Sequence, residues 1–161
     1  MLKTTRVFLR NSKIEDLDYI LQIEKDASQT GFVNLWSREK HKQAQLNALT
    51  DHLIIETTDG TSVGYLIGNQ NPDDNYELMR IVISKRGNGY GKEAIEALIG
   101  RAFKLTTHRF WLDVRSHNQK AITLYESMGF VTEGILREAV KFRDSYVSVQ
   151  VMSILRQEYE V

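Results

Sequence analysis

The sequence predicts a mixed α/β fold with a central, mostly antiparallel sheet, and two observations lead to this prediction. An Asp-Gly pair at 59–60 separates two strand-like runs, 52–57 and 62–68, which is a strong signal for a β-hairpin. After a third strand at 76–83, a helical pattern and another strand at 109–114 follow. Strands joined through a helix in this way pair in parallel. The chain therefore combines an antiparallel run with one parallel pair.

The N-terminal part predicts one short strand and two helices. Residues 7–10 have strand character, and apolar residues recur at near-helical spacing over 13–25. Ser12, with Glu15 three residues later, is a candidate N-cap for this first helix. Ser37 caps a polar stretch, 38–49, which predicts a shallow helix on the surface.

The C-terminal part predicts two further helices and two strands. A helix over 92–105 is amphipathic, and Asn118 is placed to cap the next one. Gly129 suits the left-handed residue that ends that helix. Two last strands are expected at 130–136 and 146–155. With about four helices and no linker or repeat, residues 1–161 are expected to form a single domain.

Composition excludes several classes of protein and of mechanism. Lysine plus arginine and aspartate plus glutamate number 21 each, so no overall field favours nucleic acid or an anionic membrane. The N-terminus lacks the apolar core of a signal peptide and no apolar run is long enough to span a membrane, so we expect a cytoplasmic protein. The chain has no cysteine, which excludes disulfides and a cysteine-bound intermediate.

Three glycines at alternate positions, Gly87, Gly89 and Gly91, lie between a strand end and a helix start. Such a loop converges backbone N–H groups on one point, which favours an anion, although a turn without a ligand is the plain alternative. A Walker loop is excluded, because Lys92 is followed by Glu and no glycine stands at the required upstream position. A dinucleotide loop is disfavoured because Lys92 occupies the place of its small third residue, although Asp113 suits a ribose-binding acid.

Two separated motifs resemble a known family. "RGNGYGKEAI", 86–95, resembles the pyrophosphate loop of the GNAT superfamily of acyl-CoA-dependent N-acetyltransferases. "LDVRSHNQKAITLYESMGFVTEG", 112–134, resembles that superfamily's second signature. The resemblance implies the GNAT fold, with a splayed parallel strand pair, and transfer of an acetyl group from acetyl-CoA to a primary amine. Within the superfamily, the segments "YELMRIVIS" and "EGILREAVKFRDSYVSVQVMSILRQEY" resemble the branch that includes ribosomal-protein N-terminal and polyamine acetyltransferases.

The resemblance also implies which residues contact the co-substrate acetyl-CoA. The strand feeding the loop would pair its backbone with the pantetheine arm, and the loop would hold the pyrophosphate. Asn118 would lie near the pantetheine arm or the acceptor, besides capping its helix. The implied cofactor-binding residues are Ile81, Val82, Ile83, Arg86, Gly87, Asn88, Gly89, Tyr90, Gly91, Lys92 and Asn118.

Tyr125 is the expected general acid, since a phenol held close to sulfur can protonate the departing thiolate. Its alternative role is a core tyrosine packed against the sheet. The base is Glu77 or Asp113, both on strands beside the loop. Strict alternation along 76–83 predicts that Glu77 shares a face with Met79 and Ile81, opposite Leu78 and Arg80. If that face lines the cleft, Glu77 is the base; if Arg80 only pairs with a nearby acid, Glu77 and Arg80 are both surface charges.

The remaining features leave the acceptor open. Phe32 and Trp36 could form a wall of the acceptor pocket or a lid over the core. The histidines are scattered without metal-ligand spacing, which predicts no catalytic metal: His41, His52, His108 and His117. A homodimer is compatible with the family, with strand 146–155 as a candidate edge. The rival function is a non-catalytic acyl-CoA-binding module of the same fold.

Overall fold

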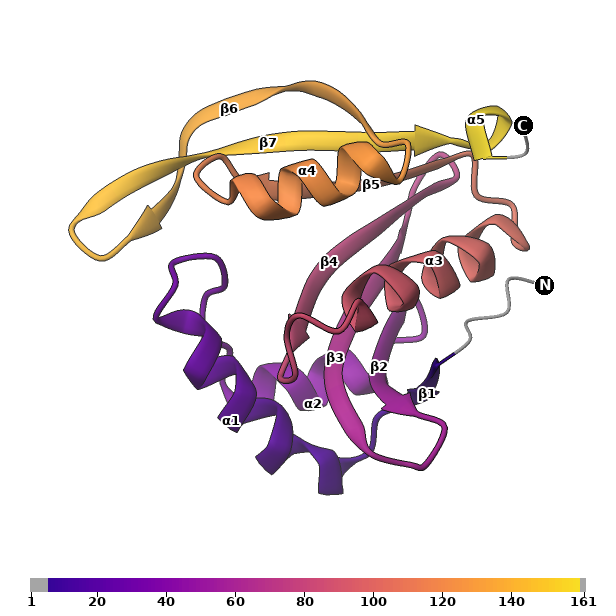
Figure 1. Cartoon of the computed structure of the whole chain (residues 1–161), viewed down its shortest axis with the longest axis vertical. Coiled ribbons are helices and arrows are strands. Elements are labelled where there is room, and N and C mark those ends of the chain that lie inside the picture. The colour runs from indigo at the N-terminus through magenta and orange to yellow at the C-terminus, as the bar shows by residue number, and fades with distance from the viewer. Residues whose placement is uncertain (1–5, 160–161) are drawn as a thin grey trace.

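The structure is a computed structural model that describes residues 6–159, and it confirms the mixed α/β class (Figure 1). The strands are β1 (Val7–Asn11), β2 (Thr50–Thr57), β3 (Ser62–Asn71), β4 (Asn75–Ile83), β5 (Arg109–Arg115), β6 (Val131–Phe142) and β7 (Ser145–Leu155). The helices are α1 (Leu17–Ser28), α2 (Arg38–Leu46), α3 (Tyr90–Phe103), α4 (Gln119–Ser127) and α5 (Arg156–Tyr159), with a 3₁₀ turn at Ile14–Asp16. The strands form one seven-stranded sheet in the order β1-β2-β3-β4-β5-β7-β6.

Most of the helix ends follow from local chemistry. The Ser37 side chain accepts a hydrogen bond from the Lys40 N–H, and Asn118 accepts one from the Ala121 N–H, so both predicted N-caps are confirmed. Gly129 has a φ of 96° and follows the end of α4 as predicted. The predicted cap at Ser12 is wrong, because the first helix begins later and the Ser12 hydroxyl contacts His52 instead.

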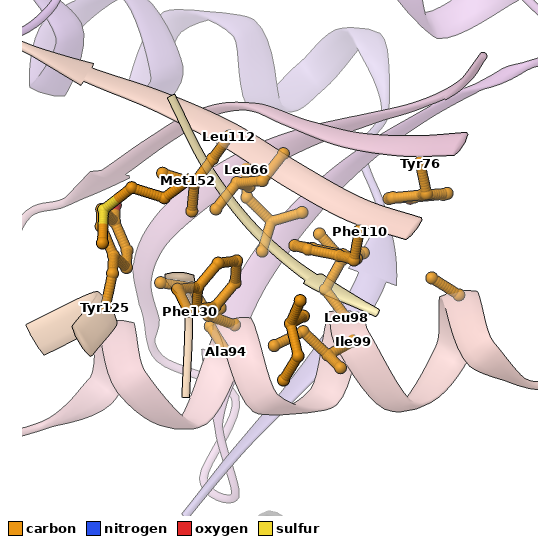
Figure 2. Close-up of a cluster of buried hydrophobic side chains, with 14 of the residues drawn as sticks. Leu66, Tyr76, Ala94, Leu98, Ile99, Phe110, Leu112, Tyr125, Phe130 and Met152 are labelled. Carbon is orange, nitrogen blue, oxygen red and sulfur yellow. The ribbon is translucent and has the colours of Figure 1, made fainter. Parts of the chain in front are cut away.

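Two apolar clusters hold the helices to opposite faces of the sheet. The larger one packs α3 and α4 against one face and contains Leu98, Phe110, Phe130 and Met152 (Figure 2). The smaller cluster packs α1 against the other face. Burying these side chains removes apolar area from water at about 25 cal/mol per Å², which is the main force that fixes the layers.

The parallel pair β4 and β5 opens after a short contact. Their register has only three pairs, which end at Glu77 opposite Trp111. Beyond this point β4 continues to pair with β3 as far as Ile83, and no strand of residues 6–159 pairs with its other edge (Figure 1). This divergence confirms the splayed pair that the family resemblance implies.

A bulge in β4 corrects the predicted face of Glu77. Leu78 pairs with Gly68 and Arg80 with Ile67, so the register shifts by one residue at Met79. Leu78 and Ile81 therefore both contact the large cluster, whereas strict alternation would have placed them on opposite faces. Glu77 lies on the α1 face together with Arg80, not opposite it.

The last two strands also differ from expectation. β7 lies between β5 and β6, so it is an interior strand and not the candidate edge. The edge strand at this end of the sheet is β6, which is longer than predicted and exposed along most of its length. None of the helices within residues 6–159 is long and apolar enough to cross a membrane.

Candidate active site

A pocket of about 1020 Å³ opens where β4 and β5 diverge. Its walls come from the glycine loop, the start of α3, the end of β5, α4 and the segment between α1 and α2. Phe32 and Trp36, from that last segment, line it as well, and the Phe32 ring lies 5.0 Å from the ring of His117. Segments that are distant in sequence thus meet around one cavity.

The glycine loop supplies a concentration of donors and positive charge at one end of this pocket. Gly87 and Gly89 have φ values of 81° and 78°, a region that favours glycine. Gly89 is the N-cap of α3 and offers no side chain, so it does not cap the first N–H groups of the helix. Arg86 and Lys92 line the same end. This arrangement fits the pyrophosphate of coenzyme A.

The implied cofactor residues are not all placed alike. Ten of them line the pocket: Ile81, Val82, Ile83, Arg86, Gly87, Gly89, Tyr90, Gly91, Lys92 and Asn118. Asn88 does not, because its side-chain amide donates to the carbonyls of Lys85 and Arg86 and so supports the loop from within. The backbone of 81–83 presents the unpaired edge of β4 to the cavity, as a strand-like pantetheine arm would require.

Tyr125 lies both in the core and at the pocket, where the two roles considered for it would place it. Its ring is 7% exposed, lies 5.7 Å from that of Phe130 and belongs to the large cluster (Figure 2). It also lines the pocket, and within residues 6–159 its hydroxyl makes no hydrogen bond. Burial raises the pKa of Tyr125 to about 12. The hydroxyl is therefore a neutral donor that has no acceptor among the described residues.

The two candidate bases share one face of the sheet. Phe110, Leu112 and Val114 point into the large cluster, so alternation puts Asp113 on the opposite, α1 face with Glu77. Burial raises the pKa of Asp113, and the nearby charge of Arg115 opposes this. Burial, followed by repulsion from Asp113, raises the pKa of Glu77. Asp113 lines the pocket and Glu77 does not.

A buried polar network beside the pocket was not predicted from the sequence. Glu24, fully buried on α1, accepts hydrogen bonds from the Trp36 N–H at 2.5 Å, from the Tyr65 hydroxyl at 2.5 Å and from His41 Nε2 at 2.9 Å. An Arg80 Nη2 nitrogen lies 3.2 Å from the same carboxylate. Burial raises the pKa of Glu24, but these donors outweigh it and the net pKa falls below the usual range.

The network continues from Glu24 toward β1. His41 Nδ1 lies 2.9 Å from His52 Nε2, and His52 Nδ1 lies 2.7 Å from the Ser12 hydroxyl. The Gln45 side-chain amide donates to that hydroxyl at 2.9 Å. Two of the histidines that the sequence left scattered thus meet in the interior. No cluster of three or more potential metal ligands occurs among residues 6–159, and the absence of a catalytic metal stays a prediction.

One sequence signal could have revealed this network. Glu24 lies seven residues after Leu17 and three before Ala27, which places a carboxylate on the buried stripe of α1. A charged residue on such a stripe needs partners. Which residues supply them depends on α2 and β2, and no local pattern connects those elements to α1.

We expect stability to fall as the pH drops from about 6.5 to about 4, in part through His52. Burial, followed by the charge of His41, lowers the pKa of His52 to about 4. In this window the unfolded chain binds a proton and the folded chain does not, so protonation favours unfolding by up to ~3 kcal/mol. Urea midpoints at pH 7 and 4.5 measure the effect. His52→Gln should reduce the difference between them, and an unchanged difference would contradict this role.

Comparison with known proteins agrees with this geometry. The acetyltransferase (GNAT) family model matches residues 17–130. An uncharacterized N-acetyltransferase, p20, of Bacillus licheniformis is 28% identical over 98% of this chain and 97% of its own. A spermidine N(1)-acetyltransferase of Vibrio cholerae is 36% identical, but over only 46% of this chain and 43% of its own.

Solved structures share the fold. The spermidine N-acetyltransferase of Vibrio cholerae in complex with CoA and spermine superimposes with a TM-score of 0.87, at 22% identity, over 98% of this chain and 100% of its own. The ribosomal-protein-S18-alanine N-acetyltransferase of Escherichia coli gives 0.77 at 24% identity, over 92% and 93%. Since the family model covers well over half of the sequence, the chain belongs to the acetyltransferase (GNAT) family of acetyl-CoA-dependent N-acetyltransferases.

Proposed function

We propose that the protein acetylates a primary amine by direct attack of the amine on acetyl-CoA within a ternary complex. The observation that carries this proposal is the single pocket that joins the glycine loop, Tyr125 and Asp113. A chain without cysteine has no thiol that could carry the acetyl group between two half-reactions. We therefore infer that the donor and the acceptor occupy the pocket together.

In this proposal each side chain has one task. The loop residues and the start of α3 bind the pyrophosphate, and the free edge of β4 aligns the thioester. Asp113, or Glu77 through water, takes a proton from the amine, which at a pKa near 10.4 is only about one part in 10³ neutral at pH 7. Tyr125 donates its hydroxyl proton to the sulfur as the C–S bond breaks.

Initial velocities test the order of events. The protein would be mixed with acetyl-CoA and a panel of amino acids, polyamines and N-terminal peptides, and thiol release would be followed. We expect intersecting double-reciprocal plots. Parallel plots or an isolable acetyl-enzyme would contradict the ternary complex. Tight CoA binding without turnover on any amine would instead support the non-catalytic module.

The pH dependence of kcat/KM separates the two candidate bases. If Asp113 is the base, Asp113→Asn should lower kcat/KM by about 10²-fold near pH 7 and remove the loss of activity at low pH. Glu77→Gln should leave both the activity and the position of the acidic limb nearly unchanged, because burial and Arg115, not Glu77, shift the pKa of Asp113. The reverse result assigns the base to Glu77, and two unchanged profiles would exclude both.

The acceptor and the assembly are further parts of the proposal. Relatives act on spermidine or on ribosomal-protein alanine, so a small amine or a protein N-terminus is the acceptor class that similarity supports. A dodecameric structure is known for the spermidine N-acetyltransferase of Vibrio cholerae, and a multimer formed through the β6 edge is compatible with this chain. The cytoplasmic location stays a prediction.

A further inference from the structure

On the α1 face of the sheet, the pocket is lined by three basic side chains and one acidic side chain. On the α1 face, β4 contributes Arg80 and β5 contributes Asp113 and Arg115, and Lys40 of α2 lines the pocket beside them. Asp113 is the one acidic side chain among the described lining residues. An acceptor with several ammonium groups would have to bind Asp113 with one of them and place the others near cations.

The charge of Arg80 is already compensated by the protein. Its guanidinium lies 3.2 Å from the buried Glu24 carboxylate, and its Nε donates to the Tyr65 hydroxyl at 3.2 Å. It also donates to the Asn34 carbonyl and stacks on the Trp36 ring, 4.7 Å from the ring centroid. The Arg80 side chain is only 9% exposed and is held in place by these contacts. Because Glu24 compensates its charge, Arg80 attracts an anionic ligand only weakly.

Arg115 is in a different situation. Its Nε donates to the Gly31 carbonyl at 3.3 Å, and no carboxylate of residues 6–159 lies within 4 Å of its guanidinium. Burial lowers the pKa of Arg115 and so does the charge of Arg80, while Asp113 opposes the decrease. A half-buried guanidinium that faces a cavity without an ion pair retains two nitrogens that can donate to an anion.

We propose that Arg115 binds a carboxylate of the acceptor, so that the substrate is a small amine that also carries a carboxylate, as amino acids do. This inference rests on the proposed acetyl transfer and narrows its acceptor class. Asp113 would receive the amine end and Arg115 the anionic end of one molecule. A guanidinium donates two parallel hydrogen bonds to a carboxylate, which orients the amine as well as binding it.

Matched acceptors test this assignment. Ornithine differs from putrescine by one carboxylate, and lysine differs from cadaverine in the same way. We expect Arg115→Gln to lower kcat/KM for ornithine and lysine by about 10- to 100-fold and to change that for putrescine and cadaverine by less than about 3-fold. Each effect is the ratio of kcat/KM in the variant to kcat/KM in the wild type for one substrate. Differences in amine pKa between the substrates therefore cancel. Arg137→Gln, an exposed arginine of β6, is the control.

Three results would overturn the inference. Equal losses for both members of each pair would show that Arg115 only supports the loop through Gly31. A higher KM for acetyl-CoA with no change in acceptor preference would assign Arg115 to the co-substrate. A preference of the wild-type protein for putrescine or spermidine over ornithine, unchanged in Arg115→Gln, would exclude carboxylate binding while acetyl transfer still stands.

Calorimetry keeps the inference separable from the proposed reaction. Ornithine and putrescine would be titrated into the protein with CoA bound. Ornithine binding that depends on Arg115, without turnover, would support the site and refute the reaction; no binding and no turnover of either would refute both.

The tripeptide amides Ala-Glu-Ala and Ala-Gln-Ala distinguish a peptide carboxylate from a free amino acid. Preferential acetylation of Ala-Glu-Ala over ornithine would overturn the small-molecule assignment.

Discussion

Tyr125→Phe is expected to lower kcat by about 10²-fold or more, with little change in the affinity for acetyl-CoA. The substitution removes one oxygen from a ring that packs in the large cluster beside Phe130, so the ring contacts remain and stability should change little. In the proposed mechanism, the substitution removes the donor that protonates the departing sulfur. A loss of this size corresponds to about 2.7 kcal/mol in the barrier.

The raised pKa of Tyr125 predicts how the loss in kcat depends on pH. A phenol with a pKa of about 12 stays protonated throughout pH 6 to 9, so the loss in kcat should be the same at every pH in that range. This distinguishes it from the loss in a base variant, which depends on pH.

Single-turnover and steady-state rates with wild type and Tyr125→Phe provide the measurement, with Tyr146→Phe as a control at an exposed tyrosine of β7. An unchanged kcat in Tyr125→Phe, with chemistry shown to be rate-limiting, would assign Tyr125 to the core alone. A loss that varies with pH across this range would contradict the neutral-donor role.

Glu24→Ala is expected to destabilise the protein by about 3–5 kcal/mol, the largest stability effect among these substitutions. The change leaves the guanidinium of Arg80 in the interior without its carboxylate. It also removes the acceptor from His41 and from the Tyr65 hydroxyl. Removing one partner of a buried pair costs more than the pair contributes, because the remaining group stays desolvated.

Thermal and urea unfolding of Glu24→Ala and Glu24→Gln measure this cost, and for a chain of this length it corresponds to a decrease of roughly 10 °C in Tm. Gln retains the size and one acceptor oxygen, so it should cost less than Ala. Glu39→Gln, at an exposed position of α2, is the matched control. A decrease of less than ~1 kcal/mol in the free energy of unfolding of Glu24→Ala would show that the buried network does not depend on the Glu24 carboxylate.

The low pKa of Glu24 adds a dependence on pH. A carboxyl whose pKa is lower in the folded than in the unfolded chain contributes full stability above the unfolded value, and that contribution is lost as pH falls through the folded value. Glu24→Gln should therefore lose less stability between pH 6 and pH 3 than the wild type. Since the Glu24 contribution is lost only below its ordinary pKa of 4.5, most of this effect falls below the pH range assigned to His52.

Features that depend on neighbouring residues were predictable. The Asp-Gly hairpin, the caps at Ser37 and Asn118 and the glycine at 129 each follow from the preference of a few adjacent residues for one backbone conformation. The glycine loop is of the same kind, since its positive φ values and the free N–H groups of α3 are local properties.

Features that depend on strand register or on partners distant in sequence could not be predicted. The bulge at Met79 reverses the alternation of β4, so Glu77 and Arg80 share a face although strict alternation separates them. A bulge arises from the fit between two strands, and the sequence of one strand contains no sign of it. The same holds for β7, whose interior position depends on β6 turning back along it.

The sequence by itself determined the class of fold, the glycine loop and the candidates Tyr125, Asp113 and Glu77, because two motifs and the order of elements are properties of the chain. Only the tertiary structure decided that Asp113 and not Glu77 lines the pocket, that Glu24 neutralises Arg80 and that Arg115 has no carboxylate partner among residues 6–159. Charge compensation depends on distances of a few ångströms between groups far apart in sequence, and these distances exist only once the sheet and its helices have packed.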